Sequence, residues 1–295
     1  MIDFRYLEKS RINEYKQYYD YSAALGCEFN FVSAYLWSKE YDLKVAVIDG
    51  TLIKAYFREN GTVWGYCMPS GRNVTGALEA VFADAEERGG RACFGYLSQR
   101  ERDALESLCP GRIDFERSET TQDYIYFSED LAKLAGKKYH AKRNHISKFY
   151  RAYPDAYVRD LTPENRGDAL AVVERWCAEN AVRHIDHAEY GVIAEALDNL
   201  ELLQMRGVIL YAGGQPAAMA LGSEISPLCF DVNFEKALKA YEGSYAVINN
   251  EFAKRLTAYR YINREEDLGL EGLRKAKLSY HPAIIYDRYN GAARW

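Results

Sequence analysis

Short apolar runs and helically spaced apolar positions alternate along the first 130 residues. Apolar runs over residues 44–48 and 52–57 flank Asp49-Gly50, a pair that predicts a two-residue hairpin turn. Apolar residues spaced three or four apart predict a helix over residues 75–88, which Gly89-Gly90 ends. The same pattern predicts helices over 5–41 and 98–108 and strands over 63–68, 93–97 and 124–127. Together these elements indicate a compact α/β unit over residues 1–130.

A second unit is expected over residues 157–295. Apolar runs at 208–212 and 217–224 flank Gly213-Gly214 and predict a hairpin in a place equivalent to that of the first one. The remaining pattern predicts helices over 163–181, 189–199 and 245–256 and strands over 228–234, 259–263 and 284–289. We therefore predict an α/β (α+β) protein of two tandem units, each a mixed, mostly antiparallel sheet flanked by helices.

The segment between the two units, residues 131–156, has its own character. Its first 23 residues hold seven Lys and Arg and no acid, so they carry +7 against −12 for the rest of the chain. Ile146, Phe149 and Tyr150 form an apolar stripe, which predicts an inter-domain helix that lies against the body. Its basic face binds either the phosphates of a ligand or acidic groups of its own protein.

The composition limits the class of protein. The net charge of −5 argues against a general nucleic-acid binder. The six cysteines form no CxxC pair and suit a reducing compartment. The N-terminus has no long apolar region, and no segment approaches eighteen consecutive apolar residues, so we predict a cytoplasmic protein without a signal peptide or transmembrane span. The five histidines have no metal-ligand spacing, since His184 and His187 lack a third ligand, and no metal is predicted.

Polar side chains follow one face of the strand at the centre of the second unit. Alternation places Asp231, Asn233 and Glu235 on the same side of this strand. Central strands of such sheets are usually apolar on both faces. These three side chains therefore either line a pocket or bond to a neighbouring loop.

The stretch over residues 261–282 combines both signs of charge. Asp267 follows a strand end, where open α/β sheets usually hold their ligands. Arg274 and Lys277 lie three apart on the helix that follows, so they share a face and can clamp an anion together. We predict that Asp231, Asn233, Asp267, Arg274 and Lys277 converge on one pocket, with Tyr280 nearby.

Three stretches resemble a known family. The segment from Gly272 to Pro282, GLRKAKLSYHP, resembles the closing motif of the phosphatidylglycerol lysyltransferase C-terminal domain family. The segment from Gly136 to His145, GKKYHAKRNH, with Phe149 after it, resembles the inter-domain signature of the soluble members of that family. Glu28-Phe29-Asn30-Phe31 with Trp37 resembles their N-terminal signature.

The resemblance implies two GNAT (acyltransferase-type) domains in tandem and an acyl or aminoacyl transfer to an amine or hydroxyl acceptor. The donor is then aminoacyl-tRNA, bound by its acceptor arm, or acyl-CoA. In GNAT enzymes a glycine-rich loop before a helix binds the CoA pyrophosphate, and the sequence here, residues 239–244, lacks the first glycine of that pattern. The alternative is a non-catalytic protein that binds a small metabolite or an amino acid on the same scaffold.

In the transferase interpretation, Asp231 or Asp267 orients or deprotonates the acceptor. Arg274 or Lys277 stabilises the oxyanion or the departing nucleotide. The other expected substrate-binding residues are Asn233, Glu235, Tyr280, Lys142, Arg143, Asn144 and Tyr245.

Overall fold

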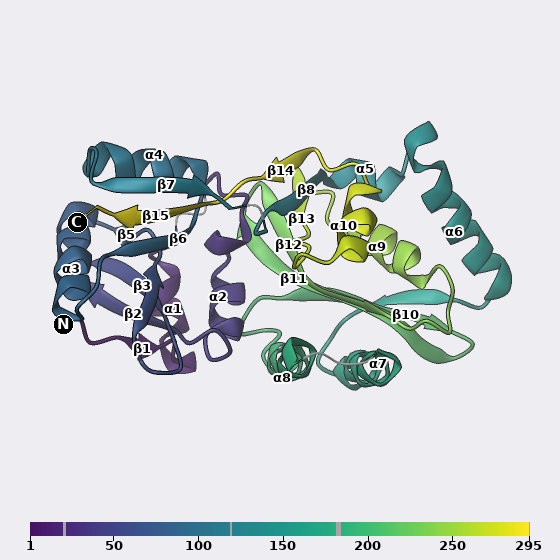
Figure 1. Cartoon of the computed structure of the whole chain (residues 1–295). Helices are drawn as coiled ribbons and strands as arrows, with labels where there is room; N and C mark the ends of the chain where they lie inside the picture. The colour runs from purple at the N-terminus through teal and green to yellow at the C-terminus, as the bar shows by residue number, and fades with distance from the viewer. Residues whose placement is uncertain (20–21, 119, 181–183, 295) are drawn as a thin grey trace.

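The computed structural model describes residues 1–19, 22–118, 120–180 and 184–294. These residues form two mixed sheets that lie side by side, each flanked by helices (Figure 1). Each sheet contains one parallel pair of strands among antiparallel neighbours. The predicted fold class is confirmed.

The first sheet has the strand order β1-β2-β3-β4-β6-β15-β7, with β5 paired to β3. Its strands are β1 (Arg5–Tyr6), β2 (Leu43–Ile48), β3 (Thr51–Phe57), β4 (Val63–Tyr66), β5 (Ser70–Gly71), β6 (Cys93–Leu97), β7 (Ile113–Arg117) and β15 (Tyr289–Ala293). Helices α3 (Val74–Glu87) and α4 (Gln99–Leu108) flank it. The predicted hairpin is confirmed, because β2 and β3 pair across Asp49 and Gly50, both at positive φ.

Helix was predicted over residues 5–41, and the described residues of this range are helical only in part. The structure instead has β1, the 3-10 turns Lys9–Arg11 and Cys27–Phe29, and two short helices, α1 (Ile12–Lys16) and α2 (Phe31–Trp37). Asn30 starts α2 as its N-cap, since its side-chain oxygen accepts hydrogen bonds from the Val32 and Ser33 N–H groups. A capping residue here begins a new helix rather than continuing an old one.

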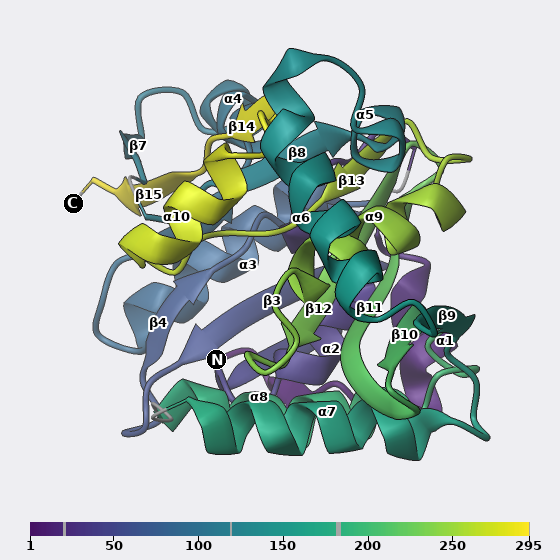
Figure 2. The ribbon, with the colours of Figure 1, turned by 90° about the vertical axis from the view of Figure 1, so that its right-hand side faces the viewer.

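The second sheet has the order β14-β8-β13-β12-β11-β10-β9. Its strands are β8 (Asp123–Phe127), β9 (Tyr157–Asp160), β10 (Arg206–Ala212), β11 (Gln215–Ser226), β12 (Cys229–Ala237), β13 (Tyr261–Asn263) and β14 (Ile284–Tyr286). Its helices are α5 (Ser128–Lys133), α6 (His140–Ala152), α7 (Arg166–Glu179), α8 (His184–Asp198), α9 (Ser244–Arg255) and α10 (Glu271–Leu278). Helices α7 and α8 cover one face, while α5, α6 and α9 cover the other (Figures 1 and 2).

The two sheets exchange strands. Strand β8, expected to end the first unit, lies between β13 and β14 of the second sheet. The single strand predicted over residues 284–289 is two strands, since β14 pairs in the second sheet and β15 crosses into the first. One apolar core also joins the halves, with Phe31 of α2 and Val172 of α7 in the same cluster. The sheets are therefore held together by both backbone and core contacts.

The basic segment is a helix over only part of its length. Helix α5 ends at Lys133, and Leu134 and Gly136 after it both have positive φ. The 3-10 turn Lys137–Tyr139 then leads into α6. The predicted apolar stripe does pack on the body, since Phe149 is buried against α9 and Ile146 and Tyr150 flank it. Figure 2 shows α6 lying across the outer side of α9.

Candidate functional site

A cavity of about 900 Å³ lies between the two sheets. The first sheet and helix α2 contribute one wall, and β12, α9, α6 and α10 contribute the other. Seven large aromatic side chains line it: Trp37, Tyr41, Tyr56, Tyr96, Trp176, Tyr245 and Tyr280. Its size and its aromatic walls are typical of a small-molecule site, and charged side chains of both signs also line it.

Part of the predicted site lines this cavity. The predicted residues at its surface are Asn233, Glu235, Lys277, Tyr280, Lys142 and Tyr245. All three stretches that carried the family resemblance also reach it, through Glu28 and Trp37, through Lys142 and His145, and through Gly272 and Lys277.

Asp231, predicted to act on the acceptor, lies beneath the cavity wall. It is fully buried, and its Oδ2 accepts hydrogen bonds from Asn30 Nδ2 at 2.9 Å and from Asn233 Nδ2 at 3.2 Å. Burial and the charges of Glu265 and Asp123 raise the pKa of Asp231 well above its usual range. Alternation correctly placed Asp231 and Asn233 on one face, but α2 of the other half covers Asp231.

Asp267 and Arg274 do not reach the cavity either, because they bond to each other. Arg274 Nε donates to Asp267 Oδ2 at 2.6 Å, and Tyr124 Oη donates to the same oxygen at 2.6 Å. Although burial acts in the opposite direction, the hydrogen bonds from Arg274 and Tyr124 lower the pKa of Asp267 to about 2. This pair closes the turn before α10.

The predicted anion clamp is not formed, because the donors of Lys277 are used within the protein. Its Nζ donates to the carbonyl oxygens of Arg264 at 2.5 Å and Glu265 at 3.0 Å, and also to that of Glu266. Arg274 is engaged with Asp267 as described. The two cations therefore fix the loop of residues 264–267 instead of holding a ligand together.

Arg143 and Asn144, also expected to bind substrate, lie outside the cavity. Arg143 donates to the carbonyl oxygens of Leu134, at 2.5 Å, and Gly136, at 2.7 Å, and so caps the end of α5. Asn144 is exposed and contacts His140 one turn before it on α6. The helix face that meets the cavity carries Lys142 and His145 instead.

Glu266 and Glu265, which the sequence analysis did not select, are the carboxyls that this loop presents to the cavity, and the one bonded to Asn233 is Glu265. Its φ of 54° is in the left-handed region, a strained backbone that the three bonds from Lys277 hold in place. Its Oε1 accepts a hydrogen bond from Asn233 at 3.4 Å. Burial, and then the charge of Asp123, raise the pKa of Glu265 to about 8. The run of acids after a strand end was the available sequence signal.

A cluster of charges closes one end of the cavity. Arg288, almost fully buried, donates to Glu28 Oε2 at 2.9 Å and to Asp123 Oδ2 at 2.7 Å. Glu28 Oε1 is buried and receives no hydrogen bond from any described residue. Burial raises the pKa of Glu28 to about 7, although Arg288 opposes this change. Lys54, whose Nζ donates to the Glu28 carbonyl oxygen at 3.4 Å, and Lys277 are also at this end, so with Glu265 and Glu266 at the wall four carboxyls face three cations.

The opposite charge gathers around Tyr280. Arg264 donates from Nη2 to Glu235 Oε1 at 2.9 Å, and its guanidinium carbon lies 5.0 Å from the centre of the Tyr280 ring. Lys142 Nζ lies 3.8 Å from the same ring centre and donates to Ser279 Oγ at 2.7 Å. Burial and the charge of Arg264 lower the pKa of Lys142 to about 8. The cavity therefore has an acidic end and a basic end.

Helix α9 begins at the cavity, where a GNAT enzyme would bind the CoA pyrophosphate. Two of its first three N–H groups are already used, since Ser244 N–H donates to Tyr241 O and Ala246 N–H to Gly243 O, each at 3.0 Å. The His145 carbonyl of α6 lies directly over Gly243, 2.9 Å from where a Cβ would be. This helix start does not offer a free phosphate cradle.

The sequence matches the family described as phosphatidylglycerol lysyltransferase, C-terminal, over residues 20–291. The chain belongs to this family. A conserved protein of unknown function from Bacteroides thetaiotaomicron has the same fold, with a TM-score of 0.91 and 35% identity over 100% of both chains.

Two family structures are more distant in sequence. A C-terminal domain assigned to a lysylphosphatidylglycerol synthetase of Agrobacterium fabrum has a TM-score of 0.68 and 14% identity, covering 98% of this chain and 93% of the other. The L-PGS of Bacillus licheniformis has a TM-score of 0.66 and 13% identity, covering 97% and 92%. At these identities the likeness shows the shared fold.

A curated relative, an uncharacterised protein of Mycoplasmoides gallisepticum, is 23% identical over 180 residues. The match covers 58% of this chain and spans 56% of that relative. As for membrane spans, none of the helices in the described part of this family member is both long and apolar enough to cross a bilayer.

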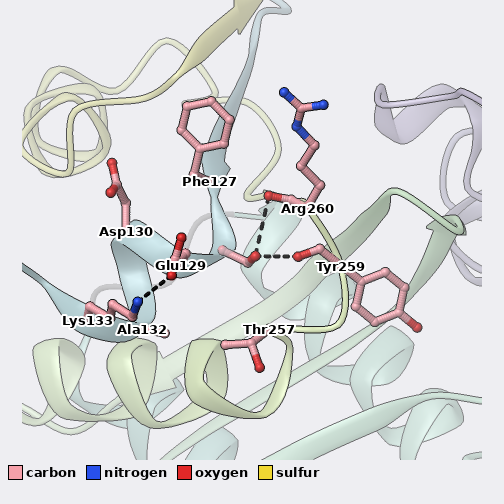
Figure 3. A pocket seen from close by; sticks show the side chains of 9 residues that line it. Phe127, Glu129, Asp130, Ala132, Lys133, Thr257, Tyr259 and Arg260 are labelled. Atoms are coloured by element: carbon pink, nitrogen blue, oxygen red, sulfur yellow. Dashed lines mark hydrogen bonds and ion pairs between the residues drawn. The ribbon is translucent and has the colours of Figure 1, made fainter.

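The chain has a second hollow, between α5 and the segment before β13, where β8 of the second sheet ends (Figure 3). Its polar groups mostly pair with one another: Ser128 Oγ donates to the carbonyl oxygens of Tyr259 and Arg260, and Lys133 pairs with Glu129.

A candidate metal centre would use Cys27, Glu28 and Asp123, whose donor atoms lie within 4.8 Å of one another. The Arg288 guanidinium already bonds all three, and burial raises the pKa of the Cys27 thiol, so this set is poorly suited to a cation. The side chains of His184 and His187 lie outside the described residues.

Proposed function

We propose that this family member is an acyltransferase of the aminoacyl type, which moves an aminoacyl group from an ester donor to an amine or hydroxyl acceptor in the cavity between the sheets. The observation that carries the proposal is Glu265, a half-buried residue whose carboxyl has a raised pKa, on a strained loop held by Lys277 at the cavity wall. Such groups are typical of general bases, whose best pKa lies near the working pH.

In this reaction Glu265 takes the proton of the acceptor as the acceptor attacks the ester carbonyl. The new bond forms from the acceptor nitrogen or oxygen to that carbonyl carbon, and the bond to the leaving alcohol of the donor breaks. The leaving oxygen takes a proton, which Glu265 can return. Asn233 orients the Glu265 carboxyl through its amide. Asp231, which is buried beneath the cavity wall, accepts a hydrogen bond from the same amide. It positions Asn233 and does not touch the substrate.

The acidic end of the cavity favours a substrate that carries an ammonium group. Glu28 Oε1 is buried and lacks a partner in the described chain, which costs free energy unless a ligand supplies a donor. An aminoacyl group brings an ammonium, whereas a simple acyl group does not. The occupied N–H groups at the start of α9 also argue for aminoacyl-tRNA over acyl-CoA as the donor.

The test is a transfer assay on the purified chain. Each radiolabelled aminoacyl-tRNA is incubated with a panel of amine and hydroxyl acceptors, and loss of the ester and appearance of a new labelled product are followed. Release of free thiol from acyl-CoA thioesters is measured in parallel. We expect turnover with aminoacyl-tRNA that Glu265→Gln reduces by about 10²-fold or more, as for loss of a general base. Glu271→Gln, an exposed acid on α10, is the matched control.

Two results would contradict the proposal. Turnover that is the same in Glu265→Gln and Glu271→Gln would remove Glu265 as the base. Tight binding of an amino acid or metabolite by the wild type, with no turnover of any donor, would favour the non-catalytic binding protein instead.

A further inference from the structure

The basic end of the cavity contains a hydrogen-bond donor that the protein leaves unused. Arg264 Nη1 is fully buried and no group in the described residues accepts from it. Its neighbour Nη2 is bonded to Glu235 Oε1. Glu235 does not accept from Nη1 as well, and its other oxygen accepts from Asn249 Nδ2 at 3.1 Å. A buried guanidinium donor without an acceptor is costly and points to a missing ligand atom.

A second cation faces the same place. Lys142 Nζ and the Arg264 guanidinium both lie within 5.0 Å of the centre of the Tyr280 ring. The one ammonium partner found for Lys142 is the neutral Ser279 hydroxyl, so its charge is not neutralised there. Two cations stand against one carboxylate, Glu235, which leaves one positive charge in excess.

We infer that Arg264 and Lys142 form a binding subsite for a phosphate ester, with the ester oxygens accepting from Arg264 Nη1 and Lys142 Nζ. A monoanionic phosphodiester would match the single excess charge and would satisfy both donors. It would also relieve the repulsion between the two cations, which lie 3.8 and 5.0 Å from the centre of the same ring.

The surroundings of Lys142 favour a phosphate ester over an isolated carboxylate. Lys142 stands on α6, whose outer surface carries further exposed cations, Lys148 and Arg151, and no acid. A ligand with a chain of phosphates can continue from the cavity along this helix. Arg274 and Lys277, which the sequence suggested for this task, are engaged elsewhere.

The inference rests on the proposed function in one respect: it takes the same cavity as the substrate site. The phosphate could come from the nucleotide part of the donor or from a phosphate-bearing acceptor. Both have the same recognition chemistry, so the experiment has to separate them.

The experiment is calorimetric titration of the intact chain with adenosine 5′-monophosphate, glycerol 3-phosphate, inorganic phosphate and acetate at constant ionic strength. We expect saturable binding of the phosphates and weaker binding of acetate. Tighter binding of the nucleotide would assign the subsite to the donor, and tighter binding of glycerol 3-phosphate to the acceptor. Lys142→Met should weaken binding roughly tenfold, the loss of one charged contact. Lys9→Met, at an exposed lysine that is not part of the cavity lining or of α6, should change it less than about twofold.

Arg264→Met is a second variant, made together with Glu235→Met so that no carboxylate is left unpaired in the wall. If this double variant is folded by circular dichroism and still binds phosphate like the wild type, the inference is wrong. It is also wrong if the wild type shows no saturable binding, or if Lys142→Met and Lys9→Met weaken binding equally. Phosphate binding without any transfer would support the subsite and contradict the proposed function. Transfer in which Lys142→Met changes neither the donor KM nor the acceptor KM would contradict the subsite and leave the proposed function standing.

Discussion

Lys277 Nζ donates a hydrogen bond to the Glu265 carbonyl oxygen at 3.0 Å, although the two residues belong to a helix and to the loop before it. The neighbouring carbonyls of Arg264 and Glu266 accept from the same ammonium. Three carbonyl oxygens turned toward one cation bend the loop and hold Glu265 at its positive φ. The lysine of the closing motif therefore acts on the backbone that presents the carboxyl, and through it on the cavity.

Glu265→Gln should stabilise the fold while it removes activity. The pKa of Glu265 is raised from 4.5 to about 8, so the folded state holds a proton that the unfolded state loses above pH 4.5. The wild type consequently loses stability as the pH rises from about 4.5 to about 8, and the amide does not. We expect a gain on the order of 1–3 kcal/mol at pH 7.5 and almost none at pH 4, measured by urea unfolding. An equal gain at both pH values would contradict the raised pKa.

The same carboxyl sets the pH dependence of transfer. A general base works only when deprotonated, so kcat/KM should rise with pH and level off above about 8. Asn233→Ala removes the amide that bonds Glu265 and Asp231. It should shift the pH at which kcat/KM is half of its plateau value, and it should also lower the rate. A variant that lowers the rate with the midpoint unchanged would indicate a structural role for Asn233.

Asp267→Asn should weaken the fold and spare phosphate binding and the pH midpoint of transfer. The pKa of Asp267 is lowered to about 2, so its contribution to stability is present above pH 4 and is lost as the pH falls toward 2. We expect a loss of about 1–3 kcal/mol at pH 7 that shrinks below pH 3. Arg274→Ala should follow the same trend more weakly, because its side chain is half exposed. Abolished transfer in a folded Asp267→Asn protein would restore the catalytic role first expected for it.

The sequence was informative where the contacts are local. The Asp49-Gly50 turn, the two hairpins and the polar face of β12 all depend on residues close in the chain, and each is found in the structure. Motif resemblance added residues such as Lys142 and Tyr280, which do line the cavity.

The remaining site depends on contacts that no local pattern encodes. Glu28 and Arg288 are 260 positions apart, and they meet because the C-terminal strand crosses from one sheet to the other. Asp231 was placed on the right face, but alternation says nothing about what covers that face, and Asn30 of the other half covers it. The choice between Asp267 and Glu265 depends on the bend imposed by Lys277.

Arg288→Met should be among the most destabilising single changes. It leaves Glu28 and Asp123 buried without their cation, a loss that typically costs about 3–5 kcal/mol. Adding Glu28→Gln and Asp123→Asn removes the stranded charges and should recover part of the stability in urea unfolding. If the triple variant is no more stable than Arg288→Met, the cost lies in packing and not in the ion pairs.

The contact between α6 and α9 can be tested with two glycines that share one backbone strain. Gly243 and Gly214 both have positive φ, at 92° and 71°, so an alanine at either position costs about 1–2 kcal/mol of conformational energy. Only at Gly243 would the added Cβ also meet a neighbour, the His145 carbonyl at 2.9 Å, while nothing lies within 4 Å at Gly214.

Gly243→Ala should therefore lose more stability than Gly214→Ala in urea unfolding, by about 1–3 kcal/mol, since the clash must be relieved by moving α6. Lys142 stands one turn before His145 on that helix, so the same change should displace it from Tyr280 and weaken phosphate binding, whereas Gly214→Ala should not. Equal losses in the two variants would show that α6 yields without cost. Loss of stability with phosphate affinity retained would show that Lys142 is not held in place by this contact.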